Sequence, residues 1–264
     1  MSTEKADDIL LSVKNMHIIE NDVTKPEYNL ALEEYLCRLT GRDGREFFIL
    51  WRNEPSVIVG RFQDVPAEVN VTFARAHNIP IIRRNSGGGA VYHDLGNVNY
   101  SFIMTESPGQ GFASFAERII RALSHLGAEA EFSLSRNDIA ANGMKVSGMA
   151  QYRHKGVILC HGTLLFDCNL DVLSVILDVP DEKLRRHGVK SVRSRVANLK
   201  PFIPHAAGTE GFMELLRREF RENGTDLVLS AHDKDEIRKL AEGKYSAPSW
   251  NFEGRSDVPN GEDI

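Results

Sequence analysis

The chain has 264 residues, of which 42% are hydrophobic and 26% are charged, and its formal net charge is −5 at pH 7. This balance is ordinary for a globular protein, and the lack of a basic excess argues against nucleic acid as a partner. No apolar run approaches the roughly 20 residues that span a bilayer, and residues 1–8 lack the apolar core of a signal peptide, so we expect a cytoplasmic protein with no membrane partner.

The first half of the chain predicts strands interrupted by helices. An amphipathic helix is expected over residues 27–38, directly after Lys25-Pro26, because proline fits the first turn of a helix. A second helix, over residues 112–126, has apolar residues at helical spacing and ends at Gly127. Short apolar runs bounded by turn residues predict the strands. The other elements of this half are strands at 47–51, 56–59, 79–82, 90–92 and 99–104 and a short helix at 69–77.

The second half begins with a meander over residues 137–166 and continues mainly as helix. Asn142-Gly143 is a strong signal for a two-residue hairpin turn, and residues 157–166 form a long β-rich run. Together the two halves predict an α+β fold, with mixed and antiparallel sheets packed against helices. We expect one domain over residues 1–252 and a flexible tail over 253–264. The helices expected after the meander are 170–177, 181–186, 211–221 and 234–242.

A glycine loop, Gly87–Gly89, lies between the β-like runs at 79–82 and 90–92. Glycine tolerates positive φ and has no Cβ, so a ligand can approach the amide groups of such a loop closely, and successive amides can bind an anion. Arg83 and Arg84 precede the loop and His93 follows it. The pattern favours a phosphate or carboxylate site; the alternative is a glycine-rich hairpin with solvated arginines.

Lys145 follows the predicted hairpin turn by two residues. In a strand, Met144 and Val146 would face the core, while Lys145 and Ser147 would face the other side. A lysine there can act as a point charge for phosphate and carboxylate oxygens. The alternative is a solvated strand lysine, which is the commoner case.

The three cysteines, Cys37, Cys160 and Cys168, are too few and too scattered for a disulfide framework or a zinc site. Cys37 lies in a helical pattern and is expected to be a buried, small apolar residue. Cys160 precedes His161, but adjacent residues of a strand point to opposite faces, so this adjacency does not make a nucleophile–base pair. We therefore do not expect a catalytic cysteine.

The segment around the glycine loop resembles the signature of the lipoate–protein ligase A family. Residues 83–97 match the family pattern Arg-Arg-x-Ser/Thr-Gly-Gly-Gly-Ala-Val-x-His-Asp-Leu-Gly-Asn throughout. A second block follows in the same order as in the family, and residues 57–63 resemble the strand and turn near the lipoyl pocket. The resemblance covers about residues 17–252. The second block comprises Arg136-Asn137-Asp138-Ile139, Gly143-x-Lys145-Val146-Ser147-Gly148-x-Ala150-Gln151 and His161-Gly162-Thr163-Leu164-Leu165.

The resemblance implies a biotin/lipoate ligase-like catalytic domain that activates lipoate with ATP and Mg²⁺ and transfers the lipoyl group to a lysine of an acceptor protein. That acceptor would be a lipoyl-domain protein, either a 2-oxoacid dehydrogenase E2 or a glycine cleavage H-like protein. Lys145 would be the catalytic lysine, in contact with the lipoyl carboxylate and the α-phosphate, and Asp138 would be a Mg²⁺ ligand. The implied lipoate and ATP site consists of Arg84, Ser86, Gly87, Gly88, Gly89, Ala90, Val91, Tyr92, His93, Asn97, Asn137, Asp138, Lys145, His161, Gly162 and Thr163.

Two departures from the family pattern matter. Many members carry a further C-terminal domain of roughly 80 to 90 residues, within the usual size of a small domain, and this chain stops about where that domain would begin. It resembles short or split members, in which a separate small accessory subunit supplies that part. Asn85 stands where many members carry arginine, which removes one possible phosphate contact.

Two other functions remain alternatives. An octanoyl or lipoyl transferase of the same fold takes its acyl group from acyl carrier protein through a cysteine thioester without ATP, but residues 128–144, where such relatives place the thiol, contain no cysteine. A lipoate-binding half of a split ligase would keep the pocket without turnover. A biotin ligase is disfavoured because the chain has no Gly-Arg-Gly-Arg loop. The sequence leaves open which acceptor is used and whether octanoate replaces lipoate.

Overall fold

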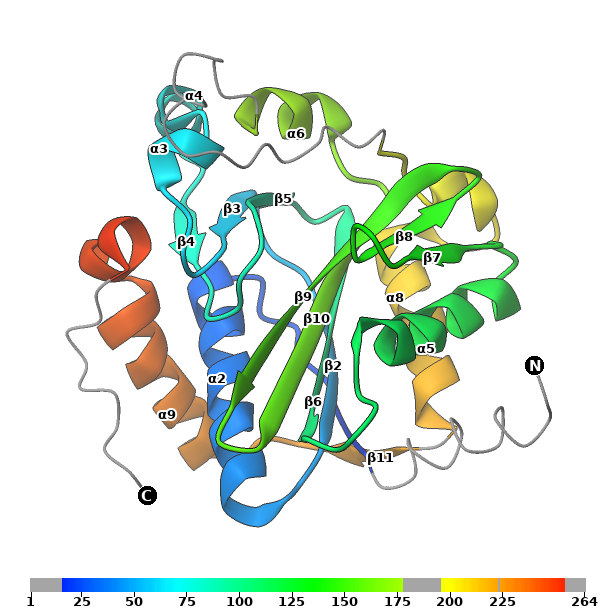
Figure 1. The fold of residues 1–264 in the computed structure, drawn as a ribbon, viewed down its shortest axis with the longest axis horizontal. Helices are drawn as coiled ribbons and strands as arrows, with labels where there is room; N and C mark the ends of the chain where they lie inside the picture. Colours follow the sequence, from blue (N-terminus) through cyan, green and yellow to red (C-terminus); the bar gives the residue numbers. More distant parts are fainter. Residues whose placement is uncertain (1–15, 178–195, 223, 255–264) are drawn as a thin grey trace.

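The computed structural model describes residues 16–177, 196–222 and 224–254, which are built around a mixed eight-stranded sheet (Figure 1). The strand order is β11-β1-β2-β6-β10-β9-β8-β7. β1 pairs in parallel with β11 and β2, whereas the pairs from β2 to β7 are antiparallel. The strands are β1 (Met16–Ile19), β2 (Phe47–Trp51), β6 (Asn97–Thr105), β7 (Glu131–Ser133), β8 (Asp138–Ala141), β9 (Met144–His154), β10 (Val157–Leu165) and β11 (Gly224–Leu227).

Helices cover both faces of the large sheet (Figure 1). One core lies between the sheet and α5 (Phe112–His125) and α8 (Gly208–Arg221), and a second lies between the sheet and α2 (Pro26–Asp43) and α9 (Ala231–Leu240). All five residues of β2 are therefore buried, with alternate side chains in the two cores. None of the described helices is long and apolar enough to cross a bilayer.

A smaller sheet, ordered β4-β3-β5, carries the glycine loop between two of its strands. β3 pairs in parallel with β4 and antiparallel with β5, and a third core joins this sheet to three short helices. Because β4 and β5 both pair with β3, the loop from one to the other must pass over the end of β3. These elements are β3 (Ser56–Val59), β4 (Ile81–Arg83), β5 (Val91–His93), α3 (Val65–Glu68), α4 (Val71–Ala76) and α6 (Leu170–Ile176).

The last described segment is helical and packs against the base of the glycine loop. It contains two π-helical turns, η2 (Ala241–Tyr245) and η3 (Ser249–Glu253); a 3-10 turn, η1 (Lys200–Phe202), lies earlier in the chain. The Trp250 indole donates to the carbonyl oxygen of Arg83, and the Asn251 side chain accepts the Arg83 amide. The residue that ends β4 is thereby tied to the C-terminal segment.

The expected α+β class with mixed sheets is confirmed, and the strands at 47–51 and 56–59 have the expected bounds. The hairpin turn is also confirmed, with positive φ at Asn142 and Gly143. The helix expected at 27–38 is longer, because Leu39 is buried and the helix stops only at Gly44, whose left-handed conformation closes it. The helix expected at 181–186 and the tail beyond Gly254 lie outside the described residues.

Candidate functional site

A band of polar side chains crosses the α2-facing side of the large sheet, which is otherwise apolar. Asn99 and Ser101 alternate along β6, and their cross-strand partners on β10 are Thr163 and His161. The residues between them on β6 belong to the core on the opposite face. Asn99 and Ser101 are at most 1% exposed and His161 is 7% exposed, so these polar groups need partners inside the protein. These four residues are called the polar band below.

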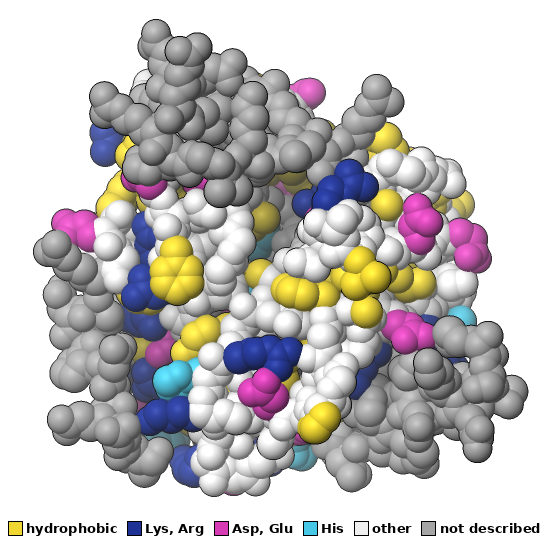
Figure 2. Space-filling model, in the orientation of Figure 1, with side chains coloured by type: hydrophobic (Ala, Val, Ile, Leu, Met, Phe, Trp, Pro, Cys, Tyr) yellow, Lys and Arg dark blue, Asp and Glu magenta, His cyan; other side chains and the backbone are white. Residues whose placement is uncertain are grey.

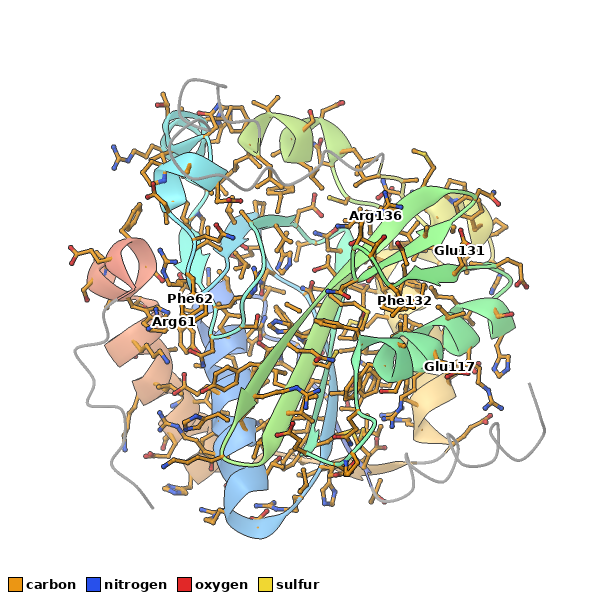
Figure 3. The ribbon with its side chains drawn as sticks, in the orientation of Figure 1. Arg61, Phe62, Glu117, Glu131, Phe132 and Arg136 are labelled. Atoms are coloured by element: carbon orange, nitrogen blue, oxygen red, sulfur yellow. The ribbon has the colours of Figure 1, made fainter. Side chains whose placement is uncertain are left out.

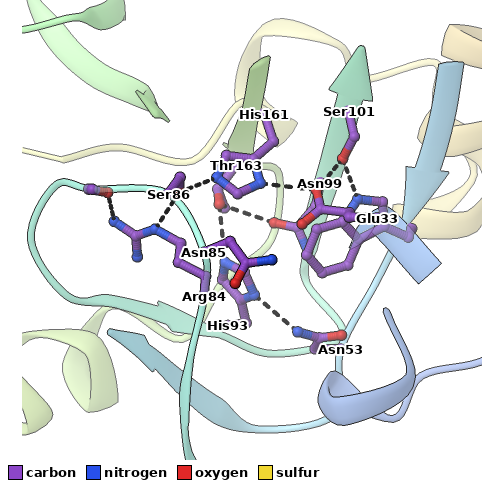
Figure 4. A network of polar contacts seen from close by, with 12 residues as sticks. Glu33, Asn53, Arg84, Asn85, Ser86, His93, Asn99, Ser101, His161 and Thr163 are labelled. Atoms are coloured by element: carbon purple, nitrogen blue, oxygen red, sulfur yellow. Dashed lines mark hydrogen bonds and ion pairs between the residues drawn. The ribbon is translucent and has the colours of Figure 1, made fainter. Parts of the chain in front are cut away.

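The first hydrogen-bond chain through the polar band joins α2 to the glycine loop (Figure 4). The Glu33 carboxylate oxygen Oε1 lies 2.8 Å from His161 Nδ1 and accepts a 2.5 Å hydrogen bond from the Ser101 hydroxyl. His161 Nε2 lies 2.6 Å from the Ser86 hydroxyl, just before the three glycines. The Trp51 indole donates to Ser101. The Glu33 carboxylate is therefore connected by hydrogen bonds through the His161 ring to Ser86, at the start of the glycine loop.

The second chain holds His93, the residue that follows the loop and β5. The Asn29 amide donates to Asn53 Oδ1, so the Asn53 amide nitrogen is free to donate to His93 Nδ1 at 3.1 Å. His93 Nε2 must then carry the proton that it shares with Thr163 Oγ1, and Thr163 donates onward to Asn99. Burial, together with the charge of nearby Arg84, lowers the pKa of His93 to about 3. His93 is therefore neutral and serves as a polar linker, not as a cation.

Two side chains hold the carbonyl oxygens of the glycine loop. One terminal nitrogen of Arg84 donates to the carbonyls of both Gly87 and Gly89, at 2.7 and 2.8 Å. Gln63 donates to the carbonyl of Gly88. No hydrogen bond found among the described residues uses the amide N–H of any of the three glycines. The loop thus turns its acceptors inward and leaves its amide donors for an anion.

The loop rests directly on the turn after β3. A Cβ at Gly60 would lie 1.8 Å from the carbonyl oxygen of Gly88, so only glycine allows this contact. Gly88 itself has φ of 88°, in the left-handed region that favours glycine. The neighbouring Arg61 stacks its guanidinium 4.5 Å from the centre of the Trp250 ring, and Phe62 is 88% exposed beside it (Figure 3).

Lys145 and Asp138 lie at one end of the same sheet face. Lys145 Nζ is 2.7 Å from Asp138 Oδ1, and the side chains are 31% and 6% exposed. The lysine folds over Gly148, where a Cβ would lie 3.2 Å from Nζ. Ala150, two residues along β9, lies within 4.0 Å of the Cβ position at Gly88. Because residues two apart on a strand share a face, the Lys145 amine and the glycine loop lie over the same side of β9.

The residues expected to form the site are therefore largely brought together, although they come from two distant blocks of sequence. The structure places three of the expected residues away from the open side of the loop. Arg84 is 5% exposed, and its guanidinium bonds the loop carbonyls, Ile58 and Ser86, so it supports the loop from beneath. Tyr92 packs in the third core because it alternates with His93 along β5. Gly162 faces the opposite side of the sheet, where the Tyr100 hydroxyl would meet any Cβ at 2.3 Å.

The other expected residues have clear positions. Asn97 is fully buried and donates to the carbonyl of Tyr92, which joins β6 to β5. Asn137 has positive φ and lies directly before β8, and its carbonyl accepts the amide of Met149. Ala90 and Val91 are partly buried at the end of the loop. The binding roles of these residues remain predictions.

Sequence reasoning assigned no role to Glu33, Asn99 and Ser101. Two signals pointed to them: Asn97, Asn99 and Ser101 alternate within an otherwise apolar strand, and Glu33 lies inside the apolar pattern of α2. Within the described residues, no group of three or more His, Cys, Asp or Glu side chains is arranged to hold a metal ion. Asp138 alone fits Mg²⁺ only as one ligand beside phosphate oxygens.

On the face shown in Figure 2, hydrophobic side chains of the described residues form separate patches, not one continuous surface. The most exposed large hydrophobic residues are scattered over different elements. The residues concerned are Phe62, Leu134 and Val228.

Residues 25–221 match the family model described as lipoyl protein ligase A/B catalytic domain. The chain is similar to lipoate-protein ligase LplJ of Bacillus subtilis (strain 168), with 41% identity over 250 residues that cover 91% of this chain and 74% of that protein. It is similar in structure to a bi-partite lipoate protein ligase of Thermoplasma acidophilum, with a TM-score of 0.80, 29% identity and coverage of 93% of this chain and 99% of that chain. It is also similar to a lipoate-protein ligase A bound with ATP, with a TM-score of 0.77, 27% identity and coverage of 90% and 98%.

Proposed function

The chain belongs to the lipoate–protein ligase family, and from that premise we propose how its residues activate lipoate with ATP and transfer the lipoyl group to an acceptor lysine. The observation that carries the proposal is the placement of the Lys145 amine and the free glycine-loop amides over one side of β9. The Lys145 amine and the loop amides can both stabilise a negative charge, and they face the same space. We assign the catalytic domain to residues 1–252, which contain the matched range 25–221.

The chemistry requires an activated carboxylate. A carboxylate oxygen is a poor leaving group, so the lipoyl carboxylate must first attack the α-phosphate of ATP, release pyrophosphate and form lipoyl-AMP. The enzyme's task is to align the two anions and to stabilise the charge that develops. Lys145 supplies a positive point charge for both, and the amides of Gly87–Gly89 supply donors whose positions are set before the substrate arrives.

Transfer of the lipoyl group to the acceptor lysine takes place at the same site. The neutral ε-amine of the acceptor lysine attacks the carbonyl carbon of lipoyl-AMP, the C–N bond forms, AMP leaves with the electron pair of the broken C–O bond, and the nitrogen releases one proton to solvent. Lys145 then stabilises the negative charge on the leaving phosphate. A bound Mg²⁺ would neutralise phosphate charge, with Asp138 as its ligand from the protein.

An acceptor lipoyl domain and an accessory subunit complete the proposal. The Thermoplasma acidophilum ligase, described as bi-partite and with its E2 lipoyl domain, is matched over 99% of its chain. We therefore propose a lipoyl-domain acceptor, of the E2 or glycine cleavage H-like class, and a separate small subunit that assists adenylation. Cytoplasmic residence stays a prediction.

A thioester-forming transferase is not favoured by the cysteines. Cys160 and Cys168 are buried in cores away from the polar band. Burial raises the pKa of Cys160 to about 12 and raises that of Cys168, so neither thiolate is available at neutral pH. Cys37 is partly buried in the core beneath α2, and burial raises its pKa as well.

The test is lipoate-dependent ATP–pyrophosphate exchange, with and without an added accessory subunit, together with acceptor lipoylation from synthetic lipoyl-AMP. Lys145→Ala should lose exchange by at least about 100-fold, because a charge that stabilises the transition state is removed. Lys200→Ala is the matched control, since Lys200 also lies 2.7 Å from an aspartate, Asp167, but is exposed and outside the polar band. Near-normal exchange by folded Lys145→Ala would contradict the assignment, and a wild-type protein inactive in every arm would contradict the function.

A further inference from the structure

One buried carboxylate in the polar band has no role in the chemistry above. We propose that Glu33 is a positioning residue that sets the geometry of the glycine loop through His161 and Ser86. The inference rests on the proposed function, because the loop is the element that would hold the anions. It concerns the loop's shape and not contact between Glu33 and substrate.

Glu33 is buried under α2 with a fixed set of donors. The residue is 3% exposed, and its Oε1 receives the Ser101 hydroxyl and pairs with His161 Nδ1. Ser101 and His161 are directly opposite each other on β6 and β10, so their two donor groups lie side by side and both bind Glu33 Oε1. A buried carboxylate without such donors would be costly, and with them it becomes a rigid anchor.

The hydrogen bonds also determine which nitrogen of His161 carries the proton. The Glu33 carboxylate can only accept, so His161 Nδ1 carries a hydrogen; Ser86 Oγ accepts the Arg84 Nε–H at 2.9 Å, and its own hydroxyl hydrogen is available to the other ring nitrogen. His161 Nε2, at 2.6 Å, is the acceptor. Glu33 therefore holds the tautomer with the proton on Nδ1, and this leaves Nε2 to receive the Ser86 hydroxyl.

The order Glu33–His161–Ser86 resembles a nucleophile, its base and the group that orients the base, but Ser86 cannot attack a substrate. Its side chain is fully buried beneath the loop, and its backbone carbonyl accepts the amide of Arg61. Ser86 directly precedes Gly87, so a shift of Ser86 displaces the loop amides. An outer partner that orients a functional group commonly changes activity by about 10- to 100-fold when it is removed.

Glu33→Gln keeps the size of the side chain and removes its charge. The amide either binds His161 more weakly or donates to Nδ1, which reverses the tautomer and leaves Ser86 without its acceptor. We expect kcat/KM for pyrophosphate exchange to fall by about 10-fold or more, with a raised KM for ATP. A purely structural defect would lower only the fraction of active enzyme and would leave KM unchanged. Tyr35→Phe is the control, because it removes a hydrogen bond from the same helix to Asp233, away from the loop.

Two substitutions of the imidazole separate its two contacts. His161→Gln can place an acceptor near the Nε2 position, next to Ser86, whereas His161→Asn can reach only the Glu33 side. The inference requires Gln to retain more exchange activity than Asn. An equal or reversed order, or Glu33→Gln exchange within about twofold of wild type with an unchanged KM, would overturn it.

The tautomer gives a test that needs no turnover. Nitrogen NMR of folded wild-type protein should show His161 protonated on Nδ1 and not on Nε2, and any other state would overturn the inference. If Glu33→Gln does not fold, this NMR measurement on the wild-type protein still tests the inference. It also separates the two proposals, because inactive wild-type protein with the expected tautomer would contradict the function and leave the loop geometry intact.

Discussion

Lys244 provides a quantitative test of how the C-terminal segment holds the base of the glycine loop. Its amine lies 2.7 Å from Glu34 Oε2 and donates to the Asn85 side chain, and both ion-pair side chains are at most 13% exposed. Asn85 also donates to Glu34. Lys244→Met keeps most of the apolar stem and removes the charged amine, which also lies 4.1 Å from the centre of the Trp250 ring.

The size of the expected destabilisation follows from the shift in the pKa of Glu34. Burial alone would raise the pKa of Glu34, but the charge and hydrogen bond of Lys244, with smaller help from Asn85 and Arg38, lower it from 4.5 to about 2. Each pKa unit corresponds to about 1.4 kcal/mol, so ionised Glu34 contributes on the order of 3 kcal/mol to the free energy of unfolding at neutral pH.

The pH dependence has a definite sign. A carboxylate with a lowered pKa stabilises the folded state above its unfolded value of 4.5, and this stability is lost as pH falls toward about 2. Between pH 6 and pH 3.5 the wild-type protein should lose about 1.4 kcal/mol at this site, because only the unfolded state takes up the proton there.

Urea unfolding at pH 6 and at pH 3.5 measures this loss in wild-type and Lys244→Met proteins. The variant should be less stable at pH 6 by no more than about 3 kcal/mol, because burial lowers the pKa of Lys244 itself and offsets part of what the pair contributes, while Asn85 and Arg38 still lower the pKa of Glu34. Its stability should also fall less on acidification, because the pKa of Glu34 is held down less. Lys239→Met is the matched control: Lys239 pairs with Glu236 at the same distance but is exposed, so no measurable change is expected. Identical pH dependence in wild type and Lys244→Met would refute the reasoning.

Two further predictions concern packing and chemistry. Gly60→Ala should lower exchange activity by about 10-fold or more and destabilise the fold by about 1–3 kcal/mol, because the added Cβ would displace Gly88. The control is Gly41→Ala in helix α2, where the nearest atom is 3.5 Å away, and this variant should be neutral or slightly stabilising in thermal unfolding. Equal exchange activity in the two variants would contradict the contact between Gly60 and Gly88. A folded variant with alanine at all three cysteines should keep ATP-dependent lipoylation, and loss of activity with acyl-thioester trapping by the parent would favour the transferase.

Local signals were sufficient for much of the fold. The strands at 47–51 and 56–59 are apolar runs bounded by turn residues, and Asn142-Gly143 tolerates the positive φ that its hairpin requires. By contrast, β1 and β11 were not expected. Their parallel pairing joins segments about 200 residues apart in sequence, and β11 is a short, polar, partly exposed strand, so neither has a clear local pattern.

From the sequence, only the site residues that lie within recognisable motifs could be predicted. The loop, Lys145 and His161 lie in recognisable blocks, but the position of Glu33 within the apolar pattern of α2 does not show which groups it contacts. Its burial depends on Ser101 and His161, which are 68 and 128 residues away in the sequence. A single sequence contains no local sign of such a partner, so the assignment of Glu33 required the register between β6 and β10.

The arginines before the loop show why charge near a glycine motif is a weak guide to ligand contact. Arg83 is 2% exposed and donates to several backbone carbonyls of the turn after β3 and of the C-terminal segment, while Arg84 bonds the loop itself.

The next two residues, Asn85 and Ser86, are held by consecutive glutamates of one helix, Glu34 directly and Glu33 through His161. Helix α2 and the C-terminal segment thus meet at the entrance of the loop. Because these supports use the polar groups before the loop, the amides of the glycines are the donors left to face an anion. The sequence pattern therefore predicts an anion site at this loop, and the contacts of Arg83 and Arg84 favour the loop amides and Lys145 over these two arginines as its ligands.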